Sequence, residues 1–181
     1  KTSNNKSTAL ASRDHTILVS KSDLITITGG KWTTYRKMAK DALNNAVFVA
    51  KLPKIKCATR KLKLHGFDAT IQYGHPLSQY GSDAKHIKDL MQTDSSMTER
   101  IHPEYNFTKA EVVWCVQHEM AVQVEDILAR RSRILFVNAS AAISSSAKVA
   151  RWMADVLKKD GAWVEQQISA IEDIAKGYLP S

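Results

Sequence analysis

Two adjacent glycines, Gly29 and Gly30, separate two different residue patterns and constrain the fold of this chain more than any other feature. Before them, two short runs rich in β-branched residues, 15–19 and 24–28, flank a polar turn, which predicts a β-hairpin. After them, apolar residues recur at three- and four-residue spacing from Tyr35 to Val47, which predicts a helix capped by Thr33 or Thr34. The sequence therefore predicts strand, glycine turn and helix in direct succession.

The rest of the chain has a different character. Residues 51–66 are rich in lysine and arginine and contain Pro53, so we interpret them as an exposed basic linker. Beyond residue 66 the pattern is helical, with a short helix expected over 82–91. A capping box of Thr108 and Glu111 starts a longer helix, which we expect to continue to the arginines at 130–133. Gly161 is expected to stop the following helix, and a last helix ends at Gly177.

These patterns predict an α+β fold in two parts. Residues 1–50 form the hairpin and helix that close one domain, 51–66 are the linker, and 67–181 form an all-α C-terminal domain. Two distant cysteines predict free thiols, and six histidines without a ligand spacing predict no metal site. No apolar run approaches the roughly 20 residues that span a bilayer, so any membrane attachment is expected to be peripheral. The chain does not begin with Met, which suggests a fragment or a processed product.

The net charge of +8 suggests an anionic partner, which could be a phosphate-bearing ligand, nucleic acid or an anionic membrane surface. The glycine turn is the best candidate for a ligand site. Paired glycines permit close approach to the backbone, the helix start attracts an anion or an electron-rich ring oxygen, and Lys31 adds a full charge. The simpler interpretation is a tight turn with a solvated lysine, because the glycine-rich pyrophosphate fingerprint is absent.

The residues at this turn resemble a known family. Residues 25–39, with the core Gly-Gly-Lys-Trp-Thr-Thr-Tyr-Arg-Lys-Met-Ala, are similar to the signature of the FAD-dependent glycerol-3-phosphate dehydrogenases of mitochondria and aerobic bacteria. Ser12-Arg13-Asp14-His15 and the helical stretches around 110–113 and 119–133 support the resemblance. The resemblance implies that Arg13 and Lys31 bind the substrate. It also implies that the cofactor FAD contacts this segment through its ring edge, at Gly29, Gly30, Lys31, Trp32 and Thr33.

The family's reaction is oxidation of sn-glycerol 3-phosphate to dihydroxyacetone phosphate, with hydride transfer to FAD and electrons passed to quinone. The GxGxxG turn and the Gly-Ile-Arg-Pro-Leu run of complete members are missing here, so the chain is expected to be inactive without an N-terminal FAD-binding part. No general base can be named. The resemblance also implies a homo-oligomer, located peripherally on the mitochondrial inner membrane of a eukaryote or on the cytoplasmic membrane face of a bacterium.

Several alternatives remain open at this point. The chain could be a non-catalytic assembly subunit, or a basic helical nucleic-acid-binding module, although it has no recognition motif and nucleic acid is not expected as a partner. His15 could assist proton transfer, or it could be a strand residue that faces solvent or packs on the sheet. Arg130, Arg131 and Arg133 could stabilise a helix end or dock the flavin domain. The tryptophans of the helical part are expected to pack in the interior.

Overall fold

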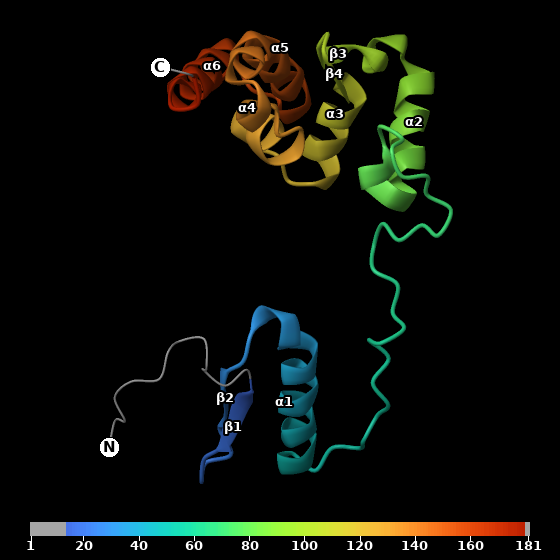
Figure 1. Cartoon of the computed structure of the whole chain (residues 1–181), viewed down its shortest axis with the longest axis vertical. Helices are drawn as coiled ribbons and strands as arrows, with labels where there is room; N and C mark the ends of the chain where they lie inside the picture. Colours follow the sequence, from blue (N-terminus) through green and yellow to red (C-terminus); the bar gives the residue numbers. More distant parts are fainter. Residues whose placement is uncertain (1–13, 180–181) are drawn as a thin grey trace. The chain divides into compact units, whose positions relative to one another are not determined.

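The structure is a computed structural model that describes residues 14–179, which form two compact units. The first unit ends at Lys63 and the second begins at Leu64, so the boundary falls within the segment interpreted as a linker (Figure 1). The first unit contains a hairpin and one long helix, and the second is mostly helical. The α+β class and the helical C-terminal part are therefore confirmed.

The first unit contains the predicted hairpin and helix. Strands β1 (His15–Val19) and β2 (Ile25–Gly29) pair antiparallel, with His15 opposite Gly29. A 3-10 turn at Trp32–Thr34 then leads into α1 (Tyr35–Val49). The expected threonine cap is wrong: the Thr34 hydroxyl accepts a hydrogen bond from the Lys31 N–H (3.1 Å) and so closes the preceding turn instead of capping α1.

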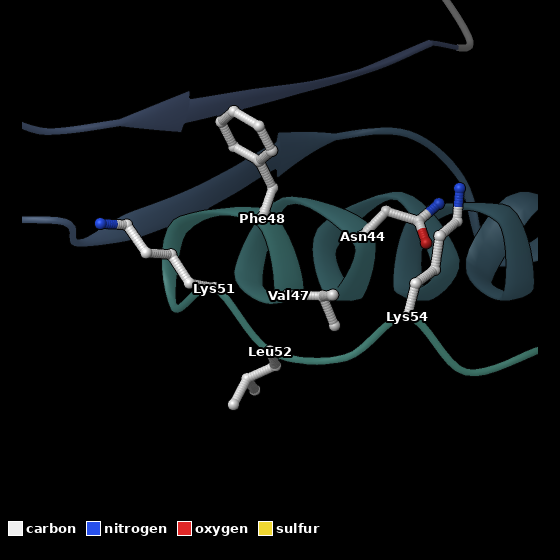
Figure 2. A pocket seen from close by; sticks show the side chains of 6 residues that line it. All are labelled: Asn44, Val47, Phe48, Lys51, Leu52 and Lys54. Carbon is white, nitrogen blue, oxygen red and sulfur yellow. The ribbon is translucent and has the colours of Figure 1, made fainter.

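The apolar residues of this unit are poorly covered. None of the described residues 14–63 is fully buried, and Leu43 and Tyr35 of the predicted apolar face of α1 are 66% and 59% exposed. A shallow pocket lies where α1 meets the connector, lined by Asn44, Val47, Phe48, Lys51, Leu52 and Lys54 (Figure 2). Residues 14–63 therefore form no hydrophobic core of their own.

The second unit contains more elements than the sequence predicted. In chain order they are a 3-10 turn Ser78–Asp83, α2 (Ala84–Thr93), a 3-10 turn Ser95–Thr98, β3 (Arg100–His102), β4 (Tyr105–Thr108), α3 (Lys109–His118), a π-helix Asp126–Arg131, α4 (Ile134–Val137), α5 (Ala139–Leu157) and α6 (Gly161–Lys176). The β3–β4 ladder corrects the expectation of an all-α domain. Strands of three and four residues are too short to show a period-2 pattern in the sequence.

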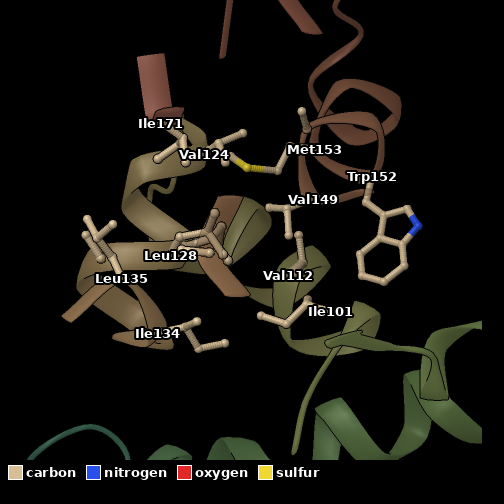
Figure 3. Packing of buried hydrophobic residues seen from close by; sticks show 14 of the residues in the cluster. Ile101, Val112, Val124, Leu128, Ile134, Leu135, Val149, Trp152, Met153 and Ile171 are labelled. Atoms are coloured by element: carbon tan, nitrogen blue, oxygen red, sulfur yellow. The ribbon is translucent and has the colours of Figure 1, made fainter. Parts of the chain in front are cut away.

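The second unit has an extensive hydrophobic core. Buried side chains from α3, the π-helix, α4, α5 and α6 pack into one cluster, which includes Val112, Leu128, Leu135, Met153 and Ile171 (Figure 3). A smaller cluster joins α2 to α3 and contains Tyr80, Ile87 and Trp114. This packing accounts for the helical pattern of the sequence beyond residue 66.

The capping box is confirmed, but the long helix after it is not. Glu111 Oε2 accepts hydrogen bonds from the N–H (2.8 Å) and the hydroxyl (2.9 Å) of Thr108, while the Thr108 hydroxyl accepts the Glu111 N–H. The helix then ends at His118, because Met120 adopts a left-handed conformation (φ 57°) with its side chain 85% exposed. Residues 126–131 form a separate π-helix.

The expected glycine stop after α5 is also wrong. Lys158 takes the left-handed conformation (φ 56°) that ends α5, and Gly161 is the first residue of α6. Asp160 explains this, because its side chain accepts the N–H of Trp163 (2.9 Å) and so caps α6. The predicted end of α6 near Gly177 is confirmed.

Within residues 14–179, none of the helices combines the length and the apolar character that a bilayer crossing requires. Both cysteines are free thiols, as predicted, with Cys57 exposed and Cys115 buried.

Candidate functional site

The backbone between β2 and α1 turns sharply at the two glycines. Gly29 and Gly30 both have φ +79°, a conformation that residues with a side chain rarely adopt. A Cβ on Gly29 would lie 3.1 Å from the Asp14 carbonyl oxygen, and one on Gly30 would lie 2.5 Å from Met38 Sδ. The space left by the missing side chains is thus filled by β1 and α1, so a ligand could approach the glycines only from their other side.

Lys31 combines a fixed backbone with an exposed side chain. It is extended (φ −137°, ψ 159°), its N–H donates to Thr34 Oγ1, and its carbonyl accepts the Thr34 N–H (2.9 Å) and hydroxyl (2.9 Å). Both of its peptide groups are therefore used inside the turn. The part of Lys31 that can reach a ligand is its ammonium group.

The next residues form the tip of the turn. Trp32 is 86% exposed and stacks on Tyr35, with ring centroids 5.5 Å apart and an interplanar angle of 23°. The N–H groups of Trp32 and Thr33 begin the turn and have no carbonyl one turn earlier to bind. The tip thus offers a cation, a flat aromatic surface and backbone donors, which suits an anionic or electron-rich planar ligand.

His15 lies beside the turn but faces the helix. Its Nε2 is 3.2 Å from Asp41 Oδ2 in α1, and its side chain is only 9% exposed. The His15 imidazole therefore packs against α1 and is not open to a ligand.

The structure describes five of the six residues singled out from the sequence, Gly29 to Thr33, and they form one continuous tip. Arg13 lies outside the described residues. Sequence reasoning missed the contribution of Tyr35, although its spacing from Trp32 is the usual one for neighbours on a helix surface. It also missed Asp41, because nothing local connects it to His15.

Arg130 and Arg131, in the last turn of the π-helix, are largely neutralised within the second unit. Arg130 pairs with Glu125 (2.7 Å) and Asp126 (3.0 Å), and Arg131 pairs with Glu119 (2.9 Å). Three carboxylates around two guanidinium groups make a poor anion site, so local stabilisation accounts for Arg130 and Arg131. Trp114 and Trp152 are almost fully buried, as expected for packing residues.

The C-terminal end of α1 and the connector form a second surface, both apolar and basic. A hollow next to the pocket of Figure 2 is lined by Leu43, Ile55 and Cys57 among others. No Asp or Glu occurs between residues 42 and 67, whereas six lysines and arginines do. A hydrogen bond with the Thr59 hydroxyl, helped by the charges of Arg36 and Lys40, lowers the pKa of the Cys57 thiol.

The chain is similar in sequence to known proteins. The family model of the C-terminal domain of alpha-glycerophosphate oxidase matches residues 20–164. A mitochondrial glycerol-3-phosphate dehydrogenase of Arabidopsis thaliana is 31% identical over 207 residues, covering 97% of this chain and 33% of the relative. Glycerol-3-phosphate dehydrogenase 1 of Mycobacterium tuberculosis is 39% identical over 136 residues, covering 70% of this chain and 26% of the relative. Glycerol-3-phosphate dehydrogenase 2 of the same species is 30% identical, covering 90% and 31%. The chain thus spans about a quarter to a third of the length of these relatives.

Proposed function

Because this chain belongs to the family of the C-terminal domain of alpha-glycerophosphate oxidase, we propose that it is the C-terminal part of an FAD-dependent glycerol-3-phosphate dehydrogenase. The observation that carries the proposal is the first unit, which has no fully buried residue among residues 14–63 and exposes a lysine and an aromatic pair at its tip. Such a unit requires other protein to cover it. The missing N-terminal FAD-binding part of a longer enzyme would supply that cover.

The residues of the tip suit the two ligands of this reaction. FAD, when bound, would accept the hydride that leaves sn-glycerol 3-phosphate as it becomes dihydroxyacetone phosphate. The Lys31 ammonium would bind the substrate phosphate, together with Arg13. The N–H groups of Trp32 and Thr33 would face the electron-rich edge of the flavin ring, in the position that the turn at Gly29 and Gly30 gives them. Because both peptide groups of Lys31 are bonded to Thr34, we assign its role to the side chain.

The remaining proposals concern the electron acceptor and the oligomeric state of the complete enzyme. Electrons would pass on to a quinone, and the complete enzyme would form a homo-oligomer. No general base is assigned among the described residues. A non-catalytic assembly subunit and a basic helical nucleic-acid-binding module remain the alternatives.

The test of the substrate role is Lys31→Met in the complete enzyme that carries this segment. Losing a charged hydrogen-bonding group costs about 1.5–3 kcal/mol, so KM for glycerol 3-phosphate should rise about 10- to 100-fold. Lys37→Met removes another exposed lysine, from the first turns of α1, and should leave KM unchanged. An unchanged KM in Lys31→Met would contradict the assignment. If the chain, joined to the rest of its enzyme, binds no flavin and shows no turnover, the alternative of a non-catalytic assembly subunit is favoured.

The apolar and basic surface at the end of α1 supports a membrane role as well. Phe48 and Ile55 are each 84% exposed, and Lys51 and Lys54 line the same pocket as Phe48. Anionic headgroups attract such lysines, while the apolar side chains enter the interface. We therefore propose peripheral attachment to an anionic membrane, which would be the mitochondrial inner membrane in a eukaryote or the cytoplasmic membrane face in a bacterium.

Sedimentation with lipid vesicles tests this attachment. The complete enzyme should bind phosphatidylcholine vesicles more strongly when phosphatidylserine is added, and Lys51→Gln with Lys54→Gln should weaken that binding. Lys158→Gln with Lys159→Gln removes the same charge from the second unit and should have a smaller effect. Equal losses in the two double variants would show a general charge effect instead of a docking surface.

A further inference from the structure

We propose that His15 and Asp41 form a positioning pair, which locks the hairpin against α1 and thereby holds the Lys31 side chain in place for the substrate phosphate. This inference rests on the proposed function, but it concerns two residues to which the proposed function gives no role. His15 and Asp41 contact neither ligand in this account. They act on the reaction only through the orientation of the tip.

The pair lies directly beside the turn. His15 is the first residue of β1 and pairs with Gly29, and the carbonyl of the preceding Asp14 accepts the Gly30 N–H (3.3 Å). The start of β1 is therefore bonded to the glycine turn through its backbone. The His15 side chain reaches in the other direction, to Asp41 Oδ2 at 3.2 Å in the second turn of α1. One strand end thus connects the turn to the helix that follows it.

The contact is better shielded than most polar contacts of this unit. The His15 side chain is 9% exposed and that of Asp41 is 35% exposed. A polar contact that is partly buried competes less with water than a contact on the surface does. Apolar packing also joins the hairpin to α1, since Met38 lies against Gly30, but Met38, Ala42 and Ile17 are only partly buried. The polar contact therefore acts together with this packing in fixing the angle between hairpin and helix.

The position of Lys31 depends on that angle. Gly29 and Gly30, both at positive φ, form the turn between the hairpin and the helix. Lys31 lies on the helix side of them, because three hydrogen bonds connect it to Thr34 at the start of α1. A rotation about the glycines would carry Lys31 along with α1. The His15–Asp41 contact opposes this rotation from the opposite side of the turn.

Steady-state kinetics of the complete enzyme test the pair. His15→Gln and Asp41→Asn should each raise KM for glycerol 3-phosphate by about 10-fold or more, since small displacements of a positioned group have effects of that size. The flavin content should stay at the wild-type level. The double variant should be no worse than the more affected single variant, because both lose the same contact. Asp173→Asn, which breaks the exposed pair with Lys176, should leave KM unchanged.

A purely structural role gives a different result. In that case the variants lose flavin and active molecules, while KM of the flavin-loaded fraction stays at the wild-type value, and the inference is overturned. Asp41→Glu keeps the charge on a longer side chain and guards against a variant that does not fold: it should retain flavin and give a KM between wild type and Asp41→Asn. An unaltered KM in Asp41→Glu and His15→Gln would also overturn the inference. If these variants leave KM unchanged while Lys31→Met raises it, the inference fails and the proposed function stands. If Lys31→Met has no effect, the substrate role that the proposed function assigns to Lys31 fails.

Discussion

Ser145 and Ser146 are neighbours on α5 and both are 1% exposed, but they differ in hydrogen bonding. Ser146 Oγ donates to the Ile143 carbonyl at 2.7 Å, whereas Ser145 Oγ has no partner among the described residues. A buried hydroxyl without a partner costs free energy that a methyl group would not. Ser145→Ala should therefore leave the free energy of unfolding unchanged or raise it by about 1 kcal/mol.

Ser146→Ala is the matched control for this prediction. It loses a made hydrogen bond and should lower the free energy of unfolding by about 1 kcal/mol. Urea unfolding followed by circular dichroism measures both changes. A larger loss in Ser145→Ala than in Ser146→Ala would show that Ser145 has a partner, such as a buried water.

Glu111 makes the stability of the second unit depend on pH. Burial raises the pKa of this carboxyl, and the hydrogen bonds from Thr108 and Tyr80 only partly oppose that rise. The folded state therefore binds the proton more tightly than the unfolded state does. The stabilisation is complete below the ordinary glutamate pKa, near 4.5, and is lost as the pH rises through the folded-state pKa.

Glu111→Gln removes this titration but can keep an acceptor for the capping box. Relative to this variant, the wild-type free energy of unfolding should fall as the pH rises above about 4.5. Urea midpoints between pH 4 and 8, in steps of about one unit, test the prediction. Parallel pH profiles of the two proteins would contradict it.

The carboxylate of Asp126 helps to hold the break between α3 and the π-helix. Asp126 Oδ2 accepts the N–H groups of Val122 (2.9 Å) and Gln123 (3.0 Å). Asp126→Ala should lower the free energy of unfolding by about 1–2 kcal/mol, as the loss of a helix cap does. Glu125→Ala loses only its ion pair with Arg130 and should cost less than about 1 kcal/mol. If both variants lose the same free energy of unfolding, the effect comes from the charges around Arg130 and not from the hydrogen bonds that Asp126 accepts from Val122 and Gln123.

The elements that the sequence predicted are those with local signals. The hairpin, α1 and the capping box each depend on residues within a few positions of one another. The break at Met120 does not, because it is held by contacts such as that between Arg131 and Glu119, 12 residues apart. A continuous apolar stripe therefore predicted one long helix where tertiary contacts form two.

The same distinction applies to the candidate site. The tip from Gly29 to Thr33 could be found from the sequence because it is one continuous motif. The contact of His15 with Asp41 could not, because it joins residues 26 positions apart without a pattern between them. The paired glycines suggest that a ligand can approach the backbone there, but the space where their side chains would lie is occupied by Met38 and Asp14. The roles of Arg13 and Lys31 stay predictions.

The two units of the whole molecule differ in the amount of core they contain. The second unit buries a large cluster, while none of the residues 14–63 is fully buried and residues 51–60 are all exposed. Limited trypsin digestion of the 181-residue chain should therefore cut first in the basic connector, after Lys54, Lys56, Arg60, Lys61 or Lys63. Mass spectrometry should then find a resistant fragment that contains the second unit. Early cleavage within α5 or α6 would contradict this difference in stability.

The exposed indole at the tip has an optical consequence. Trp32 is 86% exposed, whereas Trp114 and Trp152 are 8% and 9% exposed and Trp163 is only partly exposed, so Trp32 contributes most to the emission that dissolved iodide can quench. The neighbouring Lys31 ammonium attracts iodide and strengthens the effect. Protein or flavin that covers the tip would remove this quenching, so the fluorescence of the unlabelled chain reports when the tip is covered.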